Sequence, residues 1–435
     1  MVVTIVVLLI LAGVSISLIV DNNGIIKRSK DARNKYGEAK DNEQAQMSGV
    51  SDWIDNQVGE NGGTSKPIKV GVNEKATSNG TINGEEGNSN NPTIPEGYTP
   101  INTTTSNWGD GSTAPSQDSV DHGLVIRDDN NNEWVWIPVP DVTVMCDTSN
   151  KTEYTLCGTE GETAVTTKLY SKSEIISGKT RTTPGTSSWR EPDLVVGSNG
   201  TSYDAKEEYY KTILGFASKE KMAEAFVADY NEMIAIISKY GGFYIGRYEL
   251  SQVGVQKDKE TLVNTNWYNL YKKCKELKTN NKVETRMIWG CQWDVTMNWL
   301  ISSGAKTSDE VNKDSSSWGN YKNTSVKADD GATELKASGT SAKLNTGKTT
   351  FTMANNIYDL AGNVWEWTQE ATDTSVRADR GGVYYNYGSY FPASDRFDGS
   401  PDGSSYDIGR YSSHFNNKVT LDSRAWAPVW RIIIK

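Results

Sequence analysis

The 435-residue chain is poor in the residue types on which many catalytic and nucleic-acid-binding sites depend. Its two histidines, His122 and His414, are too few and too far apart for a histidine-rich zinc site. Lys and Arg number 45 against 55 Asp and Glu, so there is no basic excess to neutralise phosphates, and we expect no nucleic-acid partner. No G-x-S-x-G sequence occurs, which removes the nucleophile-elbow signature of serine hydrolases.

Cysteine is also scarce, and no two cysteines have C-x-x-C spacing. The four cysteines are Cys146, Cys157, Cys274 and Cys291. Two interpretations stay open: one or two disulfides in an extracellular protein, or four free buried thiols.

A local absence is more informative. Residues 381–417 contain no Lys, Glu, Gln, Met or Trp in 37 positions, yet they contain four Asp. A preference for soluble or turn-forming residues would admit some Glu, Gln or Lys. The five missing types share a genetic property, because all their codons end in a purine. Random replacement of the adenines in A-A-pyrimidine codons turns Asn into Tyr, Asp, Ser, Gly, His, Phe or Ile, and never into Lys or Trp.

What the chain does contain is aromatic: 14 Trp and 21 Tyr, which can build a core with few aliphatic residues. Alternating patterns predict strands at 133–140 and 241–251, the latter with Phe243, Ile245 and Tyr248 pointing inward. Helical spacing predicts three amphipathic helices, at 218–242, 264–278 and 291–304.

The most specific motif is NNIYDLAGNVWEWTQE, residues 355–370. Trp365 and Trp367 are two residues apart and share one face of a predicted strand, with Glu366 on the other face. Together with VWIPV, FYIGRYELS and RGG, it resembles the formylglycine-generating enzyme and sulfatase-modifying family, whose fold is a variant of the C-type lectin fold. The resemblance covers residues 110–435 and implies an α+β, C-type lectin-like domain.

The same resemblance argues against an enzyme. The family's enzymes use a pair of cysteines just after the RGG strand, where this chain reads VYYNYGSYFPASDRF. No cysteine follows Cys291, so the family's thiolate nucleophile is absent. An enzyme of unknown chemistry in the same cleft is one alternative.

The N-terminal region predicts an anchor. Residues 1–20 are apolar over about the length that crosses a bilayer, and residues 21–58 continue with one apolar helical face. This long α-helix resembles the stalk of type IV pilins and pseudopilins; a simple signal anchor is the alternative. Residues 59–109 are rich in Gly, Asn, Thr and Ser and predict a flexible spacer with at most one short strand. We therefore expect display at a cell surface, in a membrane or a pilus.

The composition of residues 381–417 resembles the variable region of proteins targeted by diversity-generating retroelements. Tyr, Ser, Gly, Asn and Asp dominate it, as in antibody loops. This implies a variable protein or glycan ligand on another cell or surface. The predicted contact residues are Tyr384, Tyr385, Asn386, Tyr387, Tyr390, Phe391, Asp395, Arg396, Phe397, Asp398, Tyr406 and Asp407. Two alternatives are that these aromatics belong to the core, or that the chain is a structural minor pilin with a lectin-like head.

We expect no required cofactor. Asn356, Asp359 and Asn363 place oxygen ligands close together near the Trp motif and are a candidate calcium site. The alternative is that these residues hydrogen-bond the backbone of their own turns.

Overall fold

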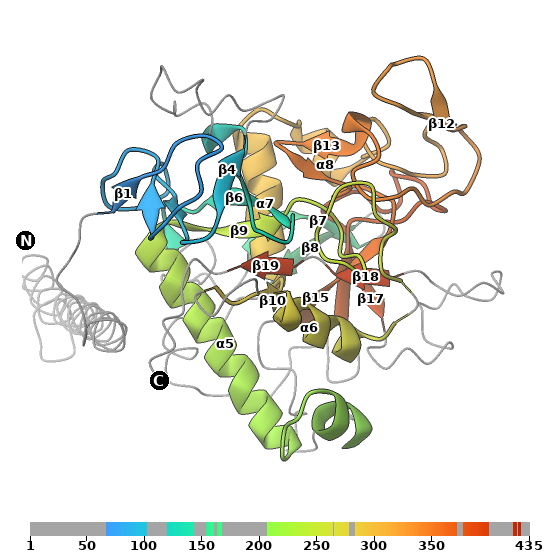
Figure 1. The fold of residues 1–435 in the computed structure, drawn as a ribbon. Coiled ribbons are helices and arrows are strands. Elements are labelled where there is room, and N and C mark those ends of the chain that lie inside the picture. Colours follow the sequence, from blue (N-terminus) through green and yellow to red (C-terminus); the bar gives the residue numbers. More distant parts are fainter. Residues whose placement is uncertain are drawn as a thin grey trace, which may run out of the picture. The chain divides into compact units, whose positions relative to one another are not determined.

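The computed structural model describes residues 67–101, 120–142, 154–160, 163–167, 207–263, 265–277, 283–371, 377–399, 421–423 and 425–427. The predicted N-terminal helix over residues 1–58 lies outside this part of the chain. Among the helices that are described, none is both long enough and apolar enough to span a membrane. The fold of the described part is a mixture of α-helices and small β-sheets (Figure 1).

The largest sheet of the described part has six antiparallel strands, in the order β10-β19-β9-β6-β5-β4. Its strands are β4 (Thr99–Ile101), β5 (Val125–Arg127), β6 (Glu133–Pro138), β9 (Gly242–Gly246), β10 (Arg286–Met287) and β19 (Ala425–Ala427). The strands predicted at 133–140 and 241–251 are confirmed as β6 and β9, and Phe243, Ile245 and Tyr248 are buried as predicted.

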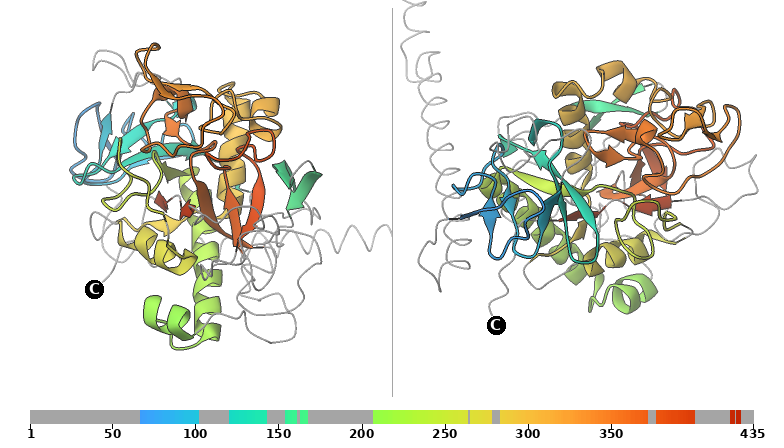
Figure 2. Two further views of the ribbon diagram at one scale, coloured as in Figure 1. Left: turned by 90° about the vertical axis from the view of Figure 1, so that its right-hand side faces the viewer. Right: turned by 45° about the horizontal axis from the view of Figure 1, so that its top comes forward.

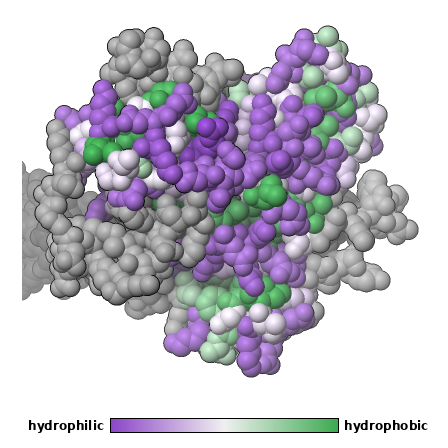
Figure 3. Space-filling model, in the orientation of Figure 1, coloured by the Kyte–Doolittle hydropathy of each residue, from purple (hydrophilic) through white to green (hydrophobic). Residues whose placement is uncertain are grey.

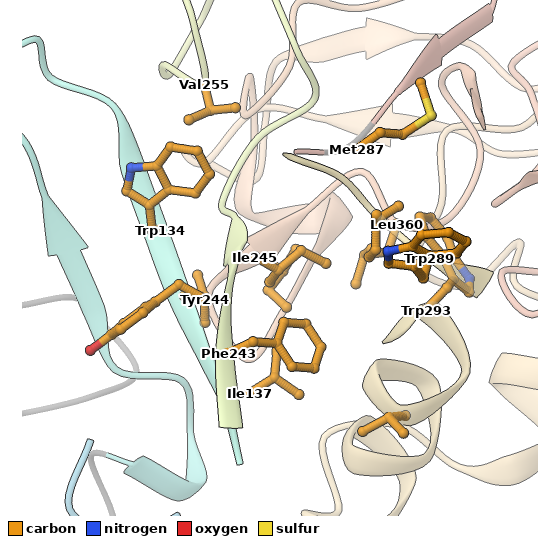
Figure 4. Packing of buried hydrophobic residues seen from close by; sticks show 14 of the residues in the cluster. Trp134, Ile137, Phe243, Tyr244, Ile245, Val255, Met287, Trp289, Trp293 and Leu360 are labelled. Carbon is orange, nitrogen blue, oxygen red and sulfur yellow. The ribbon is translucent and has the colours of Figure 1, made fainter. Parts of the chain in front are cut away.

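The alternating pattern of β9 suggests one solvent-facing side, but both sides of this strand are buried. Tyr244 lies 5.0 Å from Trp136 between ring centroids, and its hydroxyl donates a hydrogen bond to the Thr93 carbonyl. Burial raises the pKa of this hydroxyl well above its ordinary value. Figure 4 shows Phe243 and Ile245 on the other side of the strand from Tyr244, and all three belong to one buried cluster. A tyrosine at a two-sided buried position fits because its polar end finds a carbonyl.

The spacer prediction is wrong for residues 67–101. These residues form a three-stranded sheet, β1 (Ile68–Lys69), β2 (Gly80–Thr81) and β3 (Thr93–Ile94), followed by β4, which pairs with β5. Val70, Ile94 and Tyr98 are at most 1% exposed. Short polar side chains hold the turns: Thr81, for example, accepts from the Gly84 amide at 3.0 Å. A sequence with few apolar residues is thus folded by packing those few and by satisfying its turns locally. The folded domain begins before residue 110.

The three predicted helices are confirmed as α5 (Lys219–Tyr240), α6 (Trp267–Glu276) and α7 (Gly290–Ser302). Helix α5 begins at the cap Ser218, whose hydroxyl accepts from the Lys221 amide, and ends at Gly241 with φ 75°. Short helices η2 (Glu208–Ile213), α8 (Ser308–Asn312) and η3 (Thr350–Thr352) complete the described set. Helix α5 and the sheets can be followed from two further sides in Figure 2.

A four-stranded sheet, in the order β17-β16-β15-β18, contains the Trp motif. Its strands are β15 (Trp365–Ala371), β16 (Arg377–Arg380), β17 (Arg396–Gly399) and β18 (Leu421–Ser423). Strand β15 pairs antiparallel with β16 and parallel with β18. Trp365, Glu366 and Trp367 are all buried, so both faces of β15 are covered.

The remaining strands form hairpins. They are β7 (Tyr154–Glu160) with β8 (Thr163–Thr167), β11 (Val326–Lys327) with β12 (Glu334–Lys336), and β13 (Met353–Ala354) with β14 (Ile357–Tyr358). Of the cysteines whose side chains are described, Cys274 and Cys291 are buried and form no disulfide with each other. The open question of disulfides therefore concerns Cys146 and Cys157, whose side chains lie outside the described part.

Candidate ligand-binding surface

A fully buried carboxylate fixes the turn that leads into β15. Asn363 has φ 57°, a left-handed conformation that Asn tolerates, and its Nδ2 donates to Glu249 Oε2 at 2.6 Å. Glu249 Oε2 also accepts from the Thr261 hydroxyl at 2.6 Å, and Glu249 Oε1 accepts from the Val364 amide at 3.2 Å. The carbonyl of Asn363 in turn accepts from the Tyr384 amide at 3.1 Å. The same turn thus positions the Trp motif and the start of the candidate region.

A buried ion pair fixes the far end of this region. Arg380 Nη2 lies 2.6 Å from Asp294 Oδ1 of α7, and both side chains are at most 1% exposed. The Arg380 guanidinium also donates to the carbonyls of Asp395 (2.8 Å) and Ser394 (3.0 Å). Arg380, the last residue of β16, therefore fixes the backbone at Ser394 and Asp395, just before β17 begins.

Between these two ends, residues 383–394 lie along the loop that follows α8. The amide of Lys322 donates to the Asn386 carbonyl at 2.8 Å, and the amide of Gly388 donates to Asn323 Oδ1 at 3.3 Å. The Ser315 hydroxyl accepts from the Ala393 amide at 2.9 Å. The backbone of the candidate region is thus held by a loop outside it.

The tip of the held segment presents an aromatic pair. Tyr387 and Tyr390 are 40% and 52% exposed, and their rings stack with centroids 5.6 Å apart and planes 29° apart. The amide of Tyr390 donates to the Tyr387 carbonyl at 3.0 Å, which forms the turn that brings the rings together. The described face of the protein in Figure 3 is mainly hydrophilic, with smaller hydrophobic areas between polar ones. Large apolar side chains that are exposed in the described part are few, and this pair accounts for two of four.

Other predicted contact residues lie deeper. Tyr384 and Tyr385 are half-buried and contact each other edge to face, and Asn386 is also half-buried. Burial raises the pKa of the Tyr385 hydroxyl above its ordinary value, with Asp379 adding to the effect and a hydrogen bond from Trp365 opposing it. This hydroxyl is therefore protonated at neutral pH.

Phe391 and Phe397 are half-buried against the buried indole of Trp365, with ring centroids 5.0 and 5.4 Å from it. For these two residues the alternative of core packing describes the structure better than full display. Asp395, which was predicted as a ligand contact, is fully buried, so its side chain does not reach the surface. Its carbonyl accepts a hydrogen bond from Arg380. The side chains of Arg396 and Asp398, and all of Tyr406 and Asp407, lie outside the described part.

The candidate calcium residues hydrogen-bond to segments that are distant from them in the sequence. Asp359 Oδ2 accepts from the Thr346 hydroxyl (2.9 Å) and the Gly347 amide (2.8 Å), and Asn356 Nδ2 donates to the Gly123 carbonyl at 2.8 Å. Asn363 Oδ1 accepts from the Leu344 amide at 3.0 Å. In the part of the chain that the structure covers, no three His, Cys, Asp or Glu residues cluster as metal ligands would. The cited partners lie 12 or more residues away in the sequence, so these contacts are not hydrogen bonds within the residues' own turns, and calcium binding stays a prediction.

Three residues that position the candidate region were not predicted from the sequence: Glu249, Asp294 and Arg380. Asp294 lies inside a helix that reads as amphipathic, where a carboxylate normally faces water. The only sequence signal was the position of Arg380 in RGG and of Glu249 in FYIGRYELS, two of the motifs that carry the family resemblance.

The helix beside this surface should respond to pH. In the capping box of α8, Glu310 accepts from the Thr307 amide at 2.8 Å, and this bond is the main cause that lowers the pKa of Glu310 below its ordinary value. A lowered folded pKa gives stability that is present above the unfolded pKa of about 4.3 and is lost as pH falls through the folded pKa. We expect Glu310→Gln to cost up to about 1 kcal/mol at pH 6 and close to nothing at pH 3. Urea denaturation at both pH values measures this, and an equal loss at both would contradict it.

The exposed pair should tolerate change. Because Tyr387 and Tyr390 are largely in solvent, Tyr387→Ala combined with Tyr390→Ala should change the free energy of unfolding by less than about 1 kcal/mol. Phe391→Ala is the matched control. It removes the phenyl ring that packs on Trp365 and should lower the free energy of unfolding by about 2 kcal/mol or more. Urea denaturation of the two variants decides. A larger loss for the tyrosine variant would mean that these rings are structural.

Comparison with known proteins adds one distant similarity. No protein-family model and no curated protein matches the chain. Solved structures do match, among them Treponema denticola variable protein 1, at 17% sequence identity over 43% of this chain and 85% of that chain, with a TM-score of 0.25. A similarity this distant assigns neither a fold nor a ligand to the chain.

Proposed function

We propose that the chain is a surface-displayed ligand-binding protein whose residues 381–417 form a site diversified by a retroelement. The site belongs to a C-type lectin-like domain of the formylglycine-enzyme type. It binds its ligand without catalysing a covalent reaction. One observation carries the proposal: the exposed Tyr387–Tyr390 pair lies within a stretch that lacks every residue type whose codons all end in a purine.

The held backbone supports this proposal. A diversified site needs a main chain that keeps its course while side chains change. Here hydrogen bonds to the Asn363 carbonyl and from the Lys322 amide and the Arg380 guanidinium hold that course. Tyrosine supplies rigid contact area at low entropic cost, and Ser, Gly and Asn supply adaptable hydrogen bonds. The ligand that suits such a surface is a protein or a glycan on another cell. Anchoring in a membrane or pilus rests on the sequence of residues 1–58.

The test is genetic. The codons for residues 381–417 are read, and the surrounding few kilobases are searched for a near-copy beside a reverse transcriptase gene. We expect a near-copy whose mismatches fall on adenines. If there is no copy, and the codons in this stretch end in purines as often as elsewhere, the proposal is wrong.

The structure sharpens this expectation position by position. Mismatches should include the codons of the exposed residues Tyr387, Ser389 and Tyr390 and of the half-buried residues Tyr384 and Asn386. Codons for packed positions should match the copy. Gly382 has φ 78°, and a Cβ there would lie 2.4 Å from the Phe391 carbonyl oxygen; at Gly388 it would lie 2.6 Å from the Ser316 amide nitrogen. Mismatches at these glycines, with none at Tyr387 and Tyr390, would contradict the assignment of exposed and packed positions.

A further inference from the structure

Lys336, the last residue of β12, has its ammonium group inside the protein. The residue is 3% exposed. Its Nζ donates to three backbone carbonyl oxygens, those of Tyr321 (2.6 Å), Thr324 (2.6 Å) and Thr340 (3.4 Å). A lysine ammonium has three N–H donors and no acceptor, so three carbonyls match its full set of hydrogen bonds.

Among the described residues, no carboxylate forms an ion pair with this ammonium. Buried lysines are normally paired with an opposite charge. In the described part of the chain Lys336 makes no ion pair, and the carboxylate that acts on it electrostatically belongs to the exposed Glu334. Carbonyl oxygens make the hydrogen bonds to this charge, which is how backbone oxygens hold metal cations.

We propose that the carbonyl oxygens of Tyr321, Thr324 and Thr340 form a cation site that the chain fills with its own Lys336 ammonium. When the lysine side chain is shortened, a small cation from solution takes its place. Methylammonium fits because it is the end of the lysine side chain, and potassium fits because carbonyl oxygens replace its hydration shell.

The turn that supplies two of these carbonyls also touches the candidate region. The Tyr321 hydroxyl donates to the Gly381 carbonyl at 2.8 Å, and the Lys322 amide donates to the Asn386 carbonyl at 2.8 Å. On its other side, the Lys322 carbonyl accepts from the amide of Gly339, three residues after the end of β12, at 2.7 Å. Lys336 is therefore a positioning residue for the candidate surface, although it does not belong to that surface.

Thermal unfolding in three salts tests the site. Lys336→Ala opens the cage, Lys336→Met removes the charge but still fills the space, and Lys348→Met, at a surface pair with Asp258, is the control. Tm is measured at equal ionic strength in tetramethylammonium, potassium and methylammonium chloride. We expect both Lys336 variants to lose several degrees in tetramethylammonium, which is too large to enter. Only Lys336→Ala should regain Tm in the other two salts, and the control should not respond.

An unchanged Tm of Lys336→Ala across the three salts would overturn the proposal, as would an equal response of Lys336→Met. If Lys336→Ala does not fold in tetramethylammonium chloride, refolding on transfer to methylammonium chloride supports the site, and failure to refold counts against it. Hydrogen exchange tests the positioning role. The amides of Lys322 and Gly388 should exchange faster in Lys336→Ala and slow again with methylammonium, while those of β9 stay unchanged. A uniform change across the protein would show that Lys336 only adds general stability.

Discussion

Replacing Arg380 with methionine should lower the free energy of unfolding by about 3–5 kcal/mol, because it leaves the Asp294 carboxylate buried without its charged partner. The carbonyls of Ser394 and Asp395 lose their guanidinium donors in the same step. Urea denaturation followed by tryptophan fluorescence measures the loss. The variant should also loosen the entry into β17, which hydrogen exchange at the Asp395 amide detects.

Two further variants test whether the loss of stability in Arg380→Met comes from the buried, unpaired Asp294 carboxylate rather than from losing an ion pair as such. Lys313→Met removes a partner of Asp309 in a pair whose side chains are 72% and 70% exposed, and the stability should hardly change. Arg380→Met combined with Asp294→Leu removes both buried charges and should recover part of the loss, because an apolar pair carries no desolvation cost. A double variant that is less stable than Arg380→Met alone would contradict this account.

The elements that sequence analysis predicted correctly are those with local signals. Helix α5 has helical spacing, the cap Ser218 and the left-handed Gly241; strands β6 and β9 have aromatic and aliphatic runs bounded by prolines and glycines. Each of these signals lies within the element itself, so no knowledge of the fold was needed.

The framing of the candidate surface was not predictable in the same way. Asp294 and Arg380 are 86 residues apart, and Glu249 and Asn363 are 114 apart. Their contacts exist because α7 packs against β15, and because the segment after β9 reaches the turn before β15; one sequence contains no record of that packing. The prediction for the Asn-rich residues 67–101 was wrong for the opposite reason. Composition suggested a spacer, whereas side-chain hydrogen bonds within turns and six buried apolar residues fold the segment.

Within the candidate region, composition could not separate display from packing. Tyr387 and Phe391 are both aromatic and four residues apart, yet one ring is in solvent and the other lies against Trp365. The turn at Tyr387–Tyr390 stacks its two tyrosine rings on each other, whereas the ring of the next residue, Phe391, packs on Trp365. The Trp motif thus has a role toward this region that the sequence did not suggest, since its first indole forms the floor beneath it.

Trp365→Ala should therefore lower the free energy of unfolding by about 3–5 kcal/mol, as expected for removing a buried indole that leaves a cavity. Phe391 and Phe397 lose the ring on which they pack, and the Tyr385 hydroxyl loses its hydrogen-bond donor. Urea denaturation measures the loss, and Trp365→Phe, which keeps a ring in place, should lose clearly less.

The stability of Trp365→Ala relative to the Tyr387→Ala, Tyr390→Ala variant bears on the proposed function. If Trp365→Ala is strongly destabilising and the Tyr387→Ala, Tyr390→Ala variant is not, the region consists of a packed floor and a tolerant tip. That division is what a site needs if its side chains vary while its fold persists, because substitutions at the tip then cost almost no stability. If instead the tyrosine variant unfolds as readily as Trp365→Ala, the tip is itself part of the core, and free variation of its residues would destroy the domain.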